Sequence, residues 1–200
     1  TAQYVPMDEN HPLHPQSPYA AGKAAADRLC AAYYEIYKVP VVILRQFNTY
    51  GSRQRTKGYS AVVPIFVNRI FSDRPPIIYG DGNQTKDFHN IEDLIEAYQL
   101  ILNNFENLVG RVINFGTGVE TSINDLANLL LNIISQKLNR PNLTEELAPI
   151  HAPERPGEVR RFLSDISLAK KLLGFEPKVS LREGLEKYVS WYMQEHMQNL

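Results

Sequence analysis

Residues 17–46 read SPYAAGKAAADRLCAAYYEIYKVPVVILRQ, and this stretch decides the fold. Ser17 followed by Pro18 is typical of a helix start, with a hydroxyl at the N-cap and proline at the first helical position. The alanine-rich sequence that follows predicts a helix to about Lys38. Residues 39–46 form a nearly continuous β-branched run, typical of a buried parallel strand that follows a crossover helix. The stretch therefore predicts an α/β fold.

The remainder of the chain alternates between strands and helices in the same way. Strands are predicted near residues 77–79, 86–90 and 111–115, and helices near 60–71, 92–104, 122–138, 165–173 and 181–194. Residues 114–118 (NFGTG) lie between a strand and a helix but lack the Lys-Ser/Thr of a phosphate-binding P-loop, so we interpret them as a tight turn. The alternation favours an α/β architecture, with irregular loops at the positions where ligands usually bind.

Composition excludes several classes of function. Hydrophobic residues make up 44% of the 200 residues, enough for a sizeable core, and the net charge is only −1. No nucleic-acid partner is expected without a basic surplus, and no membrane partner without an apolar run of roughly 20 residues. Cys30 is the only cysteine, which excludes an intrachain disulfide and fits a cytoplasmic location. The five histidines show no metal-ligand spacing, so no metal site is expected.

The sharpest chemical signal is the pair Tyr19 and Lys23. Residues four apart on a helix share a face, with Cβ atoms roughly 5–6 Å apart. A phenol is a poor base at neutral pH, but an ammonium one turn away favours its ionised form. Such a tyrosine can move a proton on or off a hydroxyl. The alternative is a chance pairing, because the chain contains 11 tyrosines.

Seven segments carry a resemblance to a known family, in the order and at the spacing of that family. They are residues 17–27 (SPYAAGKAAAD), 44–51 (LRQFNTYG), 79–88 (YGDGNQTKDF), 92–94 (EDL), 112–118 (VINFGTG), 155–158 (RPGE) and 173–177 (LGFEP). Together they resemble the extended short-chain dehydrogenase/reductases, which are NAD-dependent nucleotide-sugar epimerases and dehydratases such as UDP-glucose 4-epimerase. The first segment corresponds to the family's Tyr-x-x-x-Lys motif.

The resemblance implies roles in catalysis and cofactor binding. Tyr19 would be the acid/base, and Lys23 would bridge the nicotinamide ribose and tune Tyr19. Gln46 and Phe47, at the end of the predicted strand, would lie near the nicotinamide of NAD.

The resemblance also implies a set of substrate contacts. The diphosphate would be bound by Asn48, Lys86 and Arg155, the nucleotide ribose by Glu158, the base by the segment around Ile77 and Tyr79, and the hexose by Phe162. Guanidinium binds phosphate through a bidentate fork, while ammonium acts as a point charge. This sequence departs from the family where Lys86 replaces a common Arg and Glu158 replaces a more usual Asp.

Two features of the family are not found in these 200 residues. There is no Gly-x-x-Gly-x-x-Gly turn for the NAD pyrophosphate, and no Ser or Thr stands at the usual place upstream of Tyr19. We therefore expect the C-terminal part of a Rossmann-like fold plus a small α/β substrate-binding domain, with little activity of its own. Residues 1–52 would belong to the Rossmann domain and 53–200 mainly to the substrate domain, with 86–118 partly returning to the Rossmann sheet. A homodimer is the expected assembly.

The reaction that the resemblance favours is epimerisation at carbon 4 of a UDP-hexose. Phe162, a bulky residue beside the hexose, would favour plain hexoses over N-acetylated ones. A nucleotide-sugar 4,6-dehydratase and a decarboxylase of the same family remain open as alternatives. From a different class, the chain could be a non-catalytic sugar-nucleotide-binding or dimerisation module.

Overall fold

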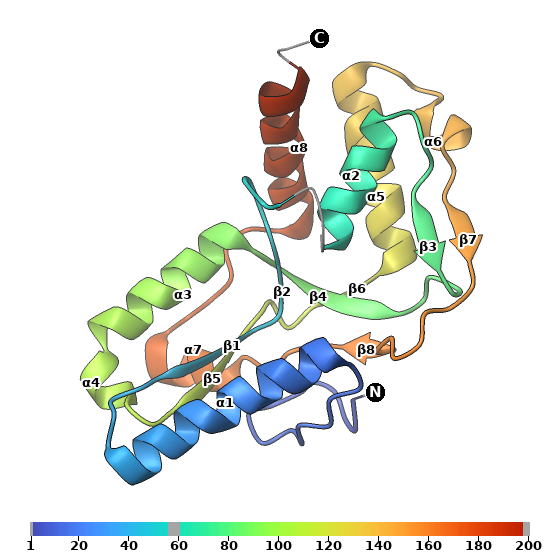
Figure 1. The fold of residues 1–200 in the computed structure, drawn as a ribbon. Coiled ribbons are helices and arrows are strands. Elements are labelled where there is room, and N and C mark those ends of the chain that lie inside the picture. The colour runs from blue at the N-terminus through green and yellow to red at the C-terminus, as the bar shows by residue number, and fades with distance from the viewer. Residues whose placement is uncertain (1, 56–60, 198–200) are drawn as a thin grey trace.

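The computed structural model describes residues 2–55 and 61–197, and Figure 1 shows its ribbon. Strands and helices alternate along the chain. Among the named strand pairs, all are parallel except β4 with β6. The α/β class predicted from the sequence is therefore confirmed.

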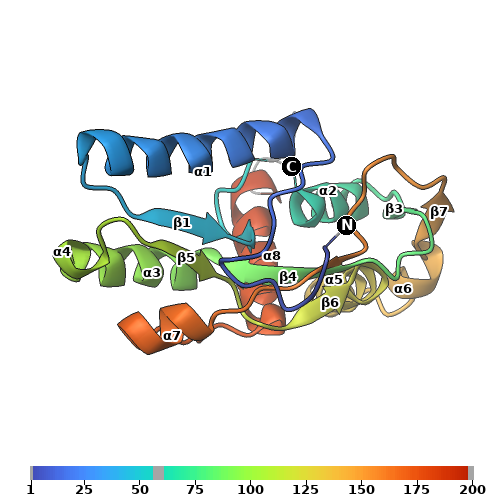
Figure 2. The same cartoon turned by 90° about the horizontal axis from the view of Figure 1, so that it is seen from below.

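One part of the molecule, which we call the α1 region, is built on a two-stranded parallel sheet. Its elements are α1 (Pro18–Tyr37), β1 (Ile43–Gln46), α3 (Ile91–Asn103), α4 (Phe105–Leu108), β5 (Val112–Phe115) and α7 (Ser167–Leu173). β1 and β5 pair in register, with Gln46 opposite Phe115 at their carboxyl ends. Figure 2 shows α1 along one face of this sheet and α3 and α7 on the other side. A small core fills that other side: Ala97, Ile101, Leu108, Ile113, Phe115, Ala169 and Phe175.

The remaining elements form what we call the α5 region. They are β2 (Asn48–Tyr50), α2 (Val62–Phe71), β3 (Ile77–Tyr79), β4 (Thr85–Asn90), β6 (Glu120–Ser122), α5 (Ile123–Leu138), α6 (Leu143–Glu146), β7 (Ile150–Ala152), β8 (Arg161–Phe162) and α8 (Leu181–Met197). β4 is parallel to β2 and β8 and antiparallel to β6, while β3 pairs with β7. α5 packs between α2 and α8 and supplies much of the larger core.

Local sequence explains where α1 and α5 begin. The Ser17 hydroxyl accepts a hydrogen bond from Ala20 N at 3.1 Å, and Pro18 occupies the first helical position of α1. Ser122 caps α5 in the same way by accepting from Asp125 N at 3.0 Å. These serine caps satisfy backbone donors that have no partner inside the helix.

Several predicted boundaries differ from the structure. The strand predicted over 39–46 pairs only from Ile43, because its partner β5 begins opposite it at Val112. The helix predicted over 60–71 is observed from Val62, and Ser60 lies outside the described residues. The sequence did not indicate the short strands β2, β6, β7 and β8, which have too few residues for a periodic pattern. Over residues 2–55 and 61–197, no helix is both long enough and apolar enough to cross a bilayer.

Candidate functional site

A pocket of about 230 Å³ opens between β2, β4, α2 and the loop before β8. Six of the seven predicted substrate-binding residues line it: Asn48, Ile77, Tyr79, Lys86, Arg155 and Glu158. They come from four separate stretches of the sequence, which the fold brings to one cavity. We call this cavity the groove.

The floor of the groove is formed where β2 pairs with β4. Asn48 is the first residue of β2 and lies opposite Phe88 in the parallel ladder. Its side-chain Nδ2 donates to Asp87 O at 3.4 Å, so the amide is held against β4. Phe47 lies between the end of β1 and the start of β2. At this residue the chain passes from the β1–β5 sheet to the sheet that contains β2 and β4.

Lys86 is one of the two cations that line the groove, with Arg155. Its Nζ donates to Val159 O at 3.1 Å, and this hydrogen bond ties β4 to the loop before β8. Burial lowers the pKa of Lys86, while the nearby Glu158 carboxylate acts in the opposite direction. An anion bound beside Lys86 would likewise favour its charged form.

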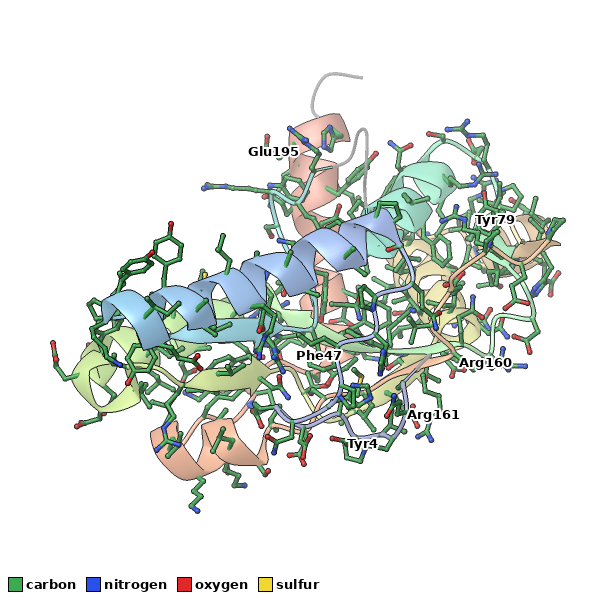
Figure 3. The ribbon with its side chains drawn as sticks, turned by 60° about the horizontal axis from the view of Figure 1, so that its bottom comes forward. Tyr4, Phe47, Tyr79, Arg160, Arg161 and Glu195 are labelled. Atoms are coloured by element: carbon green, nitrogen blue, oxygen red, sulfur yellow. The ribbon has the colours of Figure 1, made fainter. Side chains whose placement is uncertain are left out.

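Arg155 and Tyr79 form one wall of the groove. The guanidinium carbon of Arg155 lies 3.6 Å from the centroid of the Tyr79 ring, which is a cation–π contact. Figure 3 shows Tyr79 at the β3–β7 end of the molecule and Phe47 nearer to α1. Arg155 thus covers one face of the Tyr79 ring, which leaves the opposite face for stacking against a flat heteroaromatic ring.

A smaller pocket of about 180 Å³ adjoins the groove and shares Tyr79, Gln84 and Glu158 with it. Arg160 binds Asp81 at its rim through two hydrogen bonds of 2.6 and 2.8 Å. This bidentate contact holds the pKa of Asp81 well below its usual value. The Asp81–Arg160 pair fastens the turn after β3 to the start of β8.

A second large pocket, of about 280 Å³, lies between the N-terminal loop, α1 and the end of β1. Gln46, Phe47 and Phe162 line it, together with Ala20 and Ala24 from the face of α1 that points toward β1. The rings of Phe47 and Phe162 are 4.5 Å apart between centroids. The two residues predicted near the nicotinamide and the one predicted beside the hexose therefore share a single chamber.

Tyr19 and Lys23 are placed differently from the other predicted site residues. Lys23 Nζ lies 5.8 Å from the Tyr19 ring centroid, as expected for residues one helical turn apart. Tyr19 is 62% exposed. Neither residue is among the described residues that line the three pockets. Their predicted catalytic role stays a prediction.

Asp87 is a site-supporting residue that the sequence did not reveal. It is fully buried and accepts from Thr117 N at 2.9 Å, Thr117 Oγ1 at 2.6 Å and Gly118 N at 3.0 Å. It also accepts from the backbone and hydroxyl of Ser164. A Cβ on Gly116 would lie 2.7 Å from its carboxylate, so glycine is required there.

Residues 116–118 form the tight turn that the sequence predicted over 114–118, whereas Asn114 and Phe115 belong to β5. Asp93, in the first turn of α3, holds a distant segment of the chain. Its carboxylate accepts from Lys178 N at 2.9 Å and Val179 N at 3.2 Å, which fixes the segment between α7 and α8. In the part of the chain that the structure describes, no group of three or more His, Cys, Asp and Glu side chains could hold a metal ion.

Comparison with known proteins places these observations in a family. Residues 1–188 match the family model described as GDP-mannose 4,6 dehydratase. A putative UDP-glucose 4-epimerase of Methanocaldococcus jannaschii is 37% identical over 94% of this chain and 57% of its own length. A dTDP-glucose 4,6-dehydratase of Haemophilus influenzae is 32% identical over 92% of this chain and 54% of its own length. The chain thus spans little more than half the length of these relatives.

Solved structures agree with the sequence comparison. The UDP-glucose 4-epimerase of Thermotoga maritima, solved with UDP-glucose, has a TM-score of 0.84 and 32% identity over 98% of this chain and 59% of that one. The UDP-glucuronic acid 4-epimerase of Bacillus cereus, solved with UDP-glucuronic acid and NAD, has a TM-score of 0.85 and 31% identity over the same shares of the two chains. The chain therefore belongs to the GDP-mannose 4,6-dehydratase family, among the extended short-chain dehydrogenase/reductases that epimerise or dehydrate nucleotide sugars.

Proposed function

We propose that this chain is the substrate-binding part of an NAD-dependent nucleotide-sugar epimerase that acts at carbon 4 of a UDP-hexose. The observation that supports the proposal most strongly is the convergence of Asn48, Lys86 and Arg155 on one groove, next to a chamber lined by Phe47 and Phe162. A groove with two cations and an aromatic wall suits a nucleoside diphosphate. The adjoining chamber suits the sugar.

Each groove residue binds a different part of the substrate in this proposal. Lys86 contributes a partly desolvated positive charge, and Arg155 contributes a fork that matches two phosphate oxygens. Asn48 adds an amide donor that is already oriented by β4. Glu158 offers acceptors for the ribose hydroxyls, and Tyr79 offers a ring face for the base. The substrate is thereby oriented before any chemistry takes place.

The chain's own residues also fit NAD. Ligands of open α/β sheets bind at the carboxyl ends of parallel strands, and Gln46 ends β1 there, opposite Phe115. Tyr19 and Lys23 stand on the exposed surface of α1, at its amino-terminal end. When bound, NAD supplies a reversible hydride acceptor for the sugar carbon.

Tyr19 performs the proton transfer in this proposal. Its phenolate oxygen, which Lys23 stabilises, takes the proton from the hydroxyl oxygen on carbon 4 to become a phenol, and later returns that proton. Phe47 and Phe162 exclude water from the chamber that holds the hexose. Residues 1–52, with part of 86–118, form the cofactor-binding unit and residues 53–200 mainly the substrate-binding unit. Two copies associate as a homodimer.

The first test is a calorimetric titration of the 200-residue chain with UDP and with uridine. We expect one UDP per chain and much weaker uridine binding, because the cations contact the diphosphate. Lys86→Gln should weaken UDP binding by about tenfold, the size expected when one charge-assisted hydrogen bond is lost. Lys137→Gln, at an exposed position of α5, is the matched control. UDP binding that is unaffected by Lys86→Gln would contradict the proposed site.

The reaction is tested on the whole protein, of which these 200 residues form at least a part. Incubation with UDP-glucose and NAD should produce UDP-galactose of unchanged mass. A product lighter by one water would identify a 4,6-dehydratase instead, an outcome that the similarity to dTDP-glucose 4,6-dehydratases makes worth measuring. Replacing Tyr19 by Phe should abolish turnover while leaving UDP binding intact.

A further inference from the structure

The face of α1 that carries Tyr19 and Lys23 continues to a third polar residue. Asp27 follows Lys23 by another four positions, so the three side chains rise along one side of the helix. Unlike the other two, the Asp27 side chain is only 9% exposed. It lies where the helix meets β1, and it contacts a residue of that strand.

That residue is Arg45, and the contact between the two side chains is bidentate. Arg45 Nε donates to Asp27 Oδ2 at 2.7 Å and Nη2 donates to Oδ1 at 3.2 Å. Burial raises the pKa of Asp27, but the hydrogen bonds from Arg45 and Arg28 outweigh this effect and hold the pKa below its usual value. Two parallel hydrogen bonds between a guanidinium and a carboxylate fix both the distance between the two groups and their relative orientation. We call this pair the clasp.

The rest of α1 buries little side-chain surface. The helix has no fully buried residue, and the side chains that point toward the second pocket from its first turns are the small Ala20 and Ala24. Leu29, Tyr33 and Ile36 on the helix are 48–69% exposed. Apolar packing of α1 is thus limited to partly buried residues such as Tyr34, which lies against Gly110. Such packing fixes the rotation of a helix less sharply than a bidentate ion pair does.

Arg45 also anchors the chain that leads into α1. Its Nη1 donates to Glu9 O at 2.8 Å, and Glu9 Oε1 accepts from Asn114 N at 2.8 Å. The loop before Tyr19 and the part of α1 about two turns after it are thus both fastened through one guanidinium. Arg45 directly precedes Gln46, which lines the chamber proposed for the sugar and nicotinamide.

We propose that the Asp27–Arg45 clasp positions Tyr19 and Lys23 over the end of β1, and so sets the rate of the chemical step without touching substrate or cofactor. This inference rests on the proposed function. Asp27 and Arg45 are positioning residues in this scheme, and their effect on the reaction passes through the placement of α1. A displacement of about 1 Å at a reacting group is enough to slow a reaction by up to about 100-fold.

The clasp can be tested by measuring the position of α1 directly. Cys30, the only cysteine, is exposed on α1 and accepts a spin label, and Leu102→Cys provides a second exposed site on α3. The distance distribution between the two labels should be narrow in the parent chain. Asp27→Ala should broaden or shift it, whereas Arg140→Lys, which alters an ion pair between exposed loops, should not. An unchanged distribution in Asp27→Ala would overturn the proposal.

Kinetics of the whole protein separate positioning from simple stabilisation. Asp27→Glu keeps the ion pair but lengthens it by one methylene. It should lower kcat by about tenfold or more and leave KM within about twofold, with an unchanged unfolding midpoint. A purely structural ion pair predicts a wild-type kcat for Asp27→Glu, and that result would overturn the proposal. Absence of turnover by the wild-type protein would overturn the proposed function and the catalytic half of this inference, while the distance measurement still tests the clasp.

Discussion

The long helices α5 and α1, one from each region, are buried to very different extents. α5 is 16 residues long and has seven buried residues, including Leu130 and Ile134, which are fully buried. α1 is longer, with 20 residues, but none of them is buried. The groove therefore rests on a buried apolar core, whereas the helix that carries Tyr19 lies on its sheet without a single buried residue.

The difference matters for what each region can do alone. The described residues include side chains that line the groove and a large apolar core beside it. α1 instead presents Leu29, Tyr33, Ile36 and Tyr37 to solvent, and an apolar stripe of this kind is typical of a surface that another polypeptide covers. We infer that ligand binding in the groove depends less on additional chain than the placement of Tyr19 does.

The largest expected effect is the loss of stability when a leucine of α5 is replaced by alanine, compared with the same replacement in α1. Leu130→Ala should lower the free energy of unfolding by about 3 kcal/mol, because it leaves a cavity in the core beneath the groove. Leu29→Ala, at a position 59% exposed on α1, should change it by less than about 0.5 kcal/mol. Urea unfolding followed by circular dichroism measures both. Equal losses in the two variants would mean that α1 is as firmly packed as α5.

A smaller effect is expected where the two regions are joined. Asp87→Asn keeps the size of the side chain but replaces one acceptor oxygen by a donor amide, which then faces the donors of Thr117, Gly118 and Ser164. We expect a loss of about 2 kcal/mol of stability. Asp73→Asn, in an exposed ion pair with Arg140, should cost less than about 0.5 kcal/mol. Similar unfolding midpoints for the two variants would show that the Asp87 network does not couple the regions.

The sequence predicts α1 and β1 well because their signals are local. Ser17 and Pro18 mark the helix start, and the apolar run that ends at Gln46 marks the strand, so no distant residue is needed. The groove is different. Its lining residues were assigned by resemblance to a family, since nothing in the spacing of Asn48 and Arg155 indicates that the fold brings them together.

Asp87 illustrates why the rest was not predictable. Its partners lie about 30 and 77 positions further along the chain, at Thr117 and Ser164. Strand alternation places Asp87 on the face opposite Lys86, but it does not say whether that face is buried or what lies on it. Only the meeting of β4 with the turn after β5 and with Ser164 gives the carboxylate its role.

The smallest expected effect is a change in the pH dependence of stability. It depends on whether water reaches His89, beside the core of the α1 region. His89 on β4 is fully buried, and its ring lies edge-on to Phe175 of that core at 6.1 Å. Neither ring nitrogen has a hydrogen-bond partner among the described residues. Burial lowers the pKa of His89, and the carboxylates of Asp93 and Asp87 only partly oppose this effect. The folded state therefore disfavours the protonated ring.

The sign of the pH dependence follows from proton uptake. Below about pH 6.5 the unfolded chain protonates this histidine while the folded chain resists, so stability falls as pH falls, by at most about 1.4 kcal/mol per pH unit. His89→Phe should keep the edge-on contact and flatten the stability between pH 5 and 7. His14→Phe, at an exposed position, should retain the slope of the parent chain. Carboxylates with lowered pKa values, such as Asp27 and Glu120, lose their stabilising contribution only at more acidic pH, below that window. If His89→Phe keeps the full slope, His89 gains a proton in the folded state as easily as in the unfolded chain, and the core of the α1 region is wetter than its packing indicates.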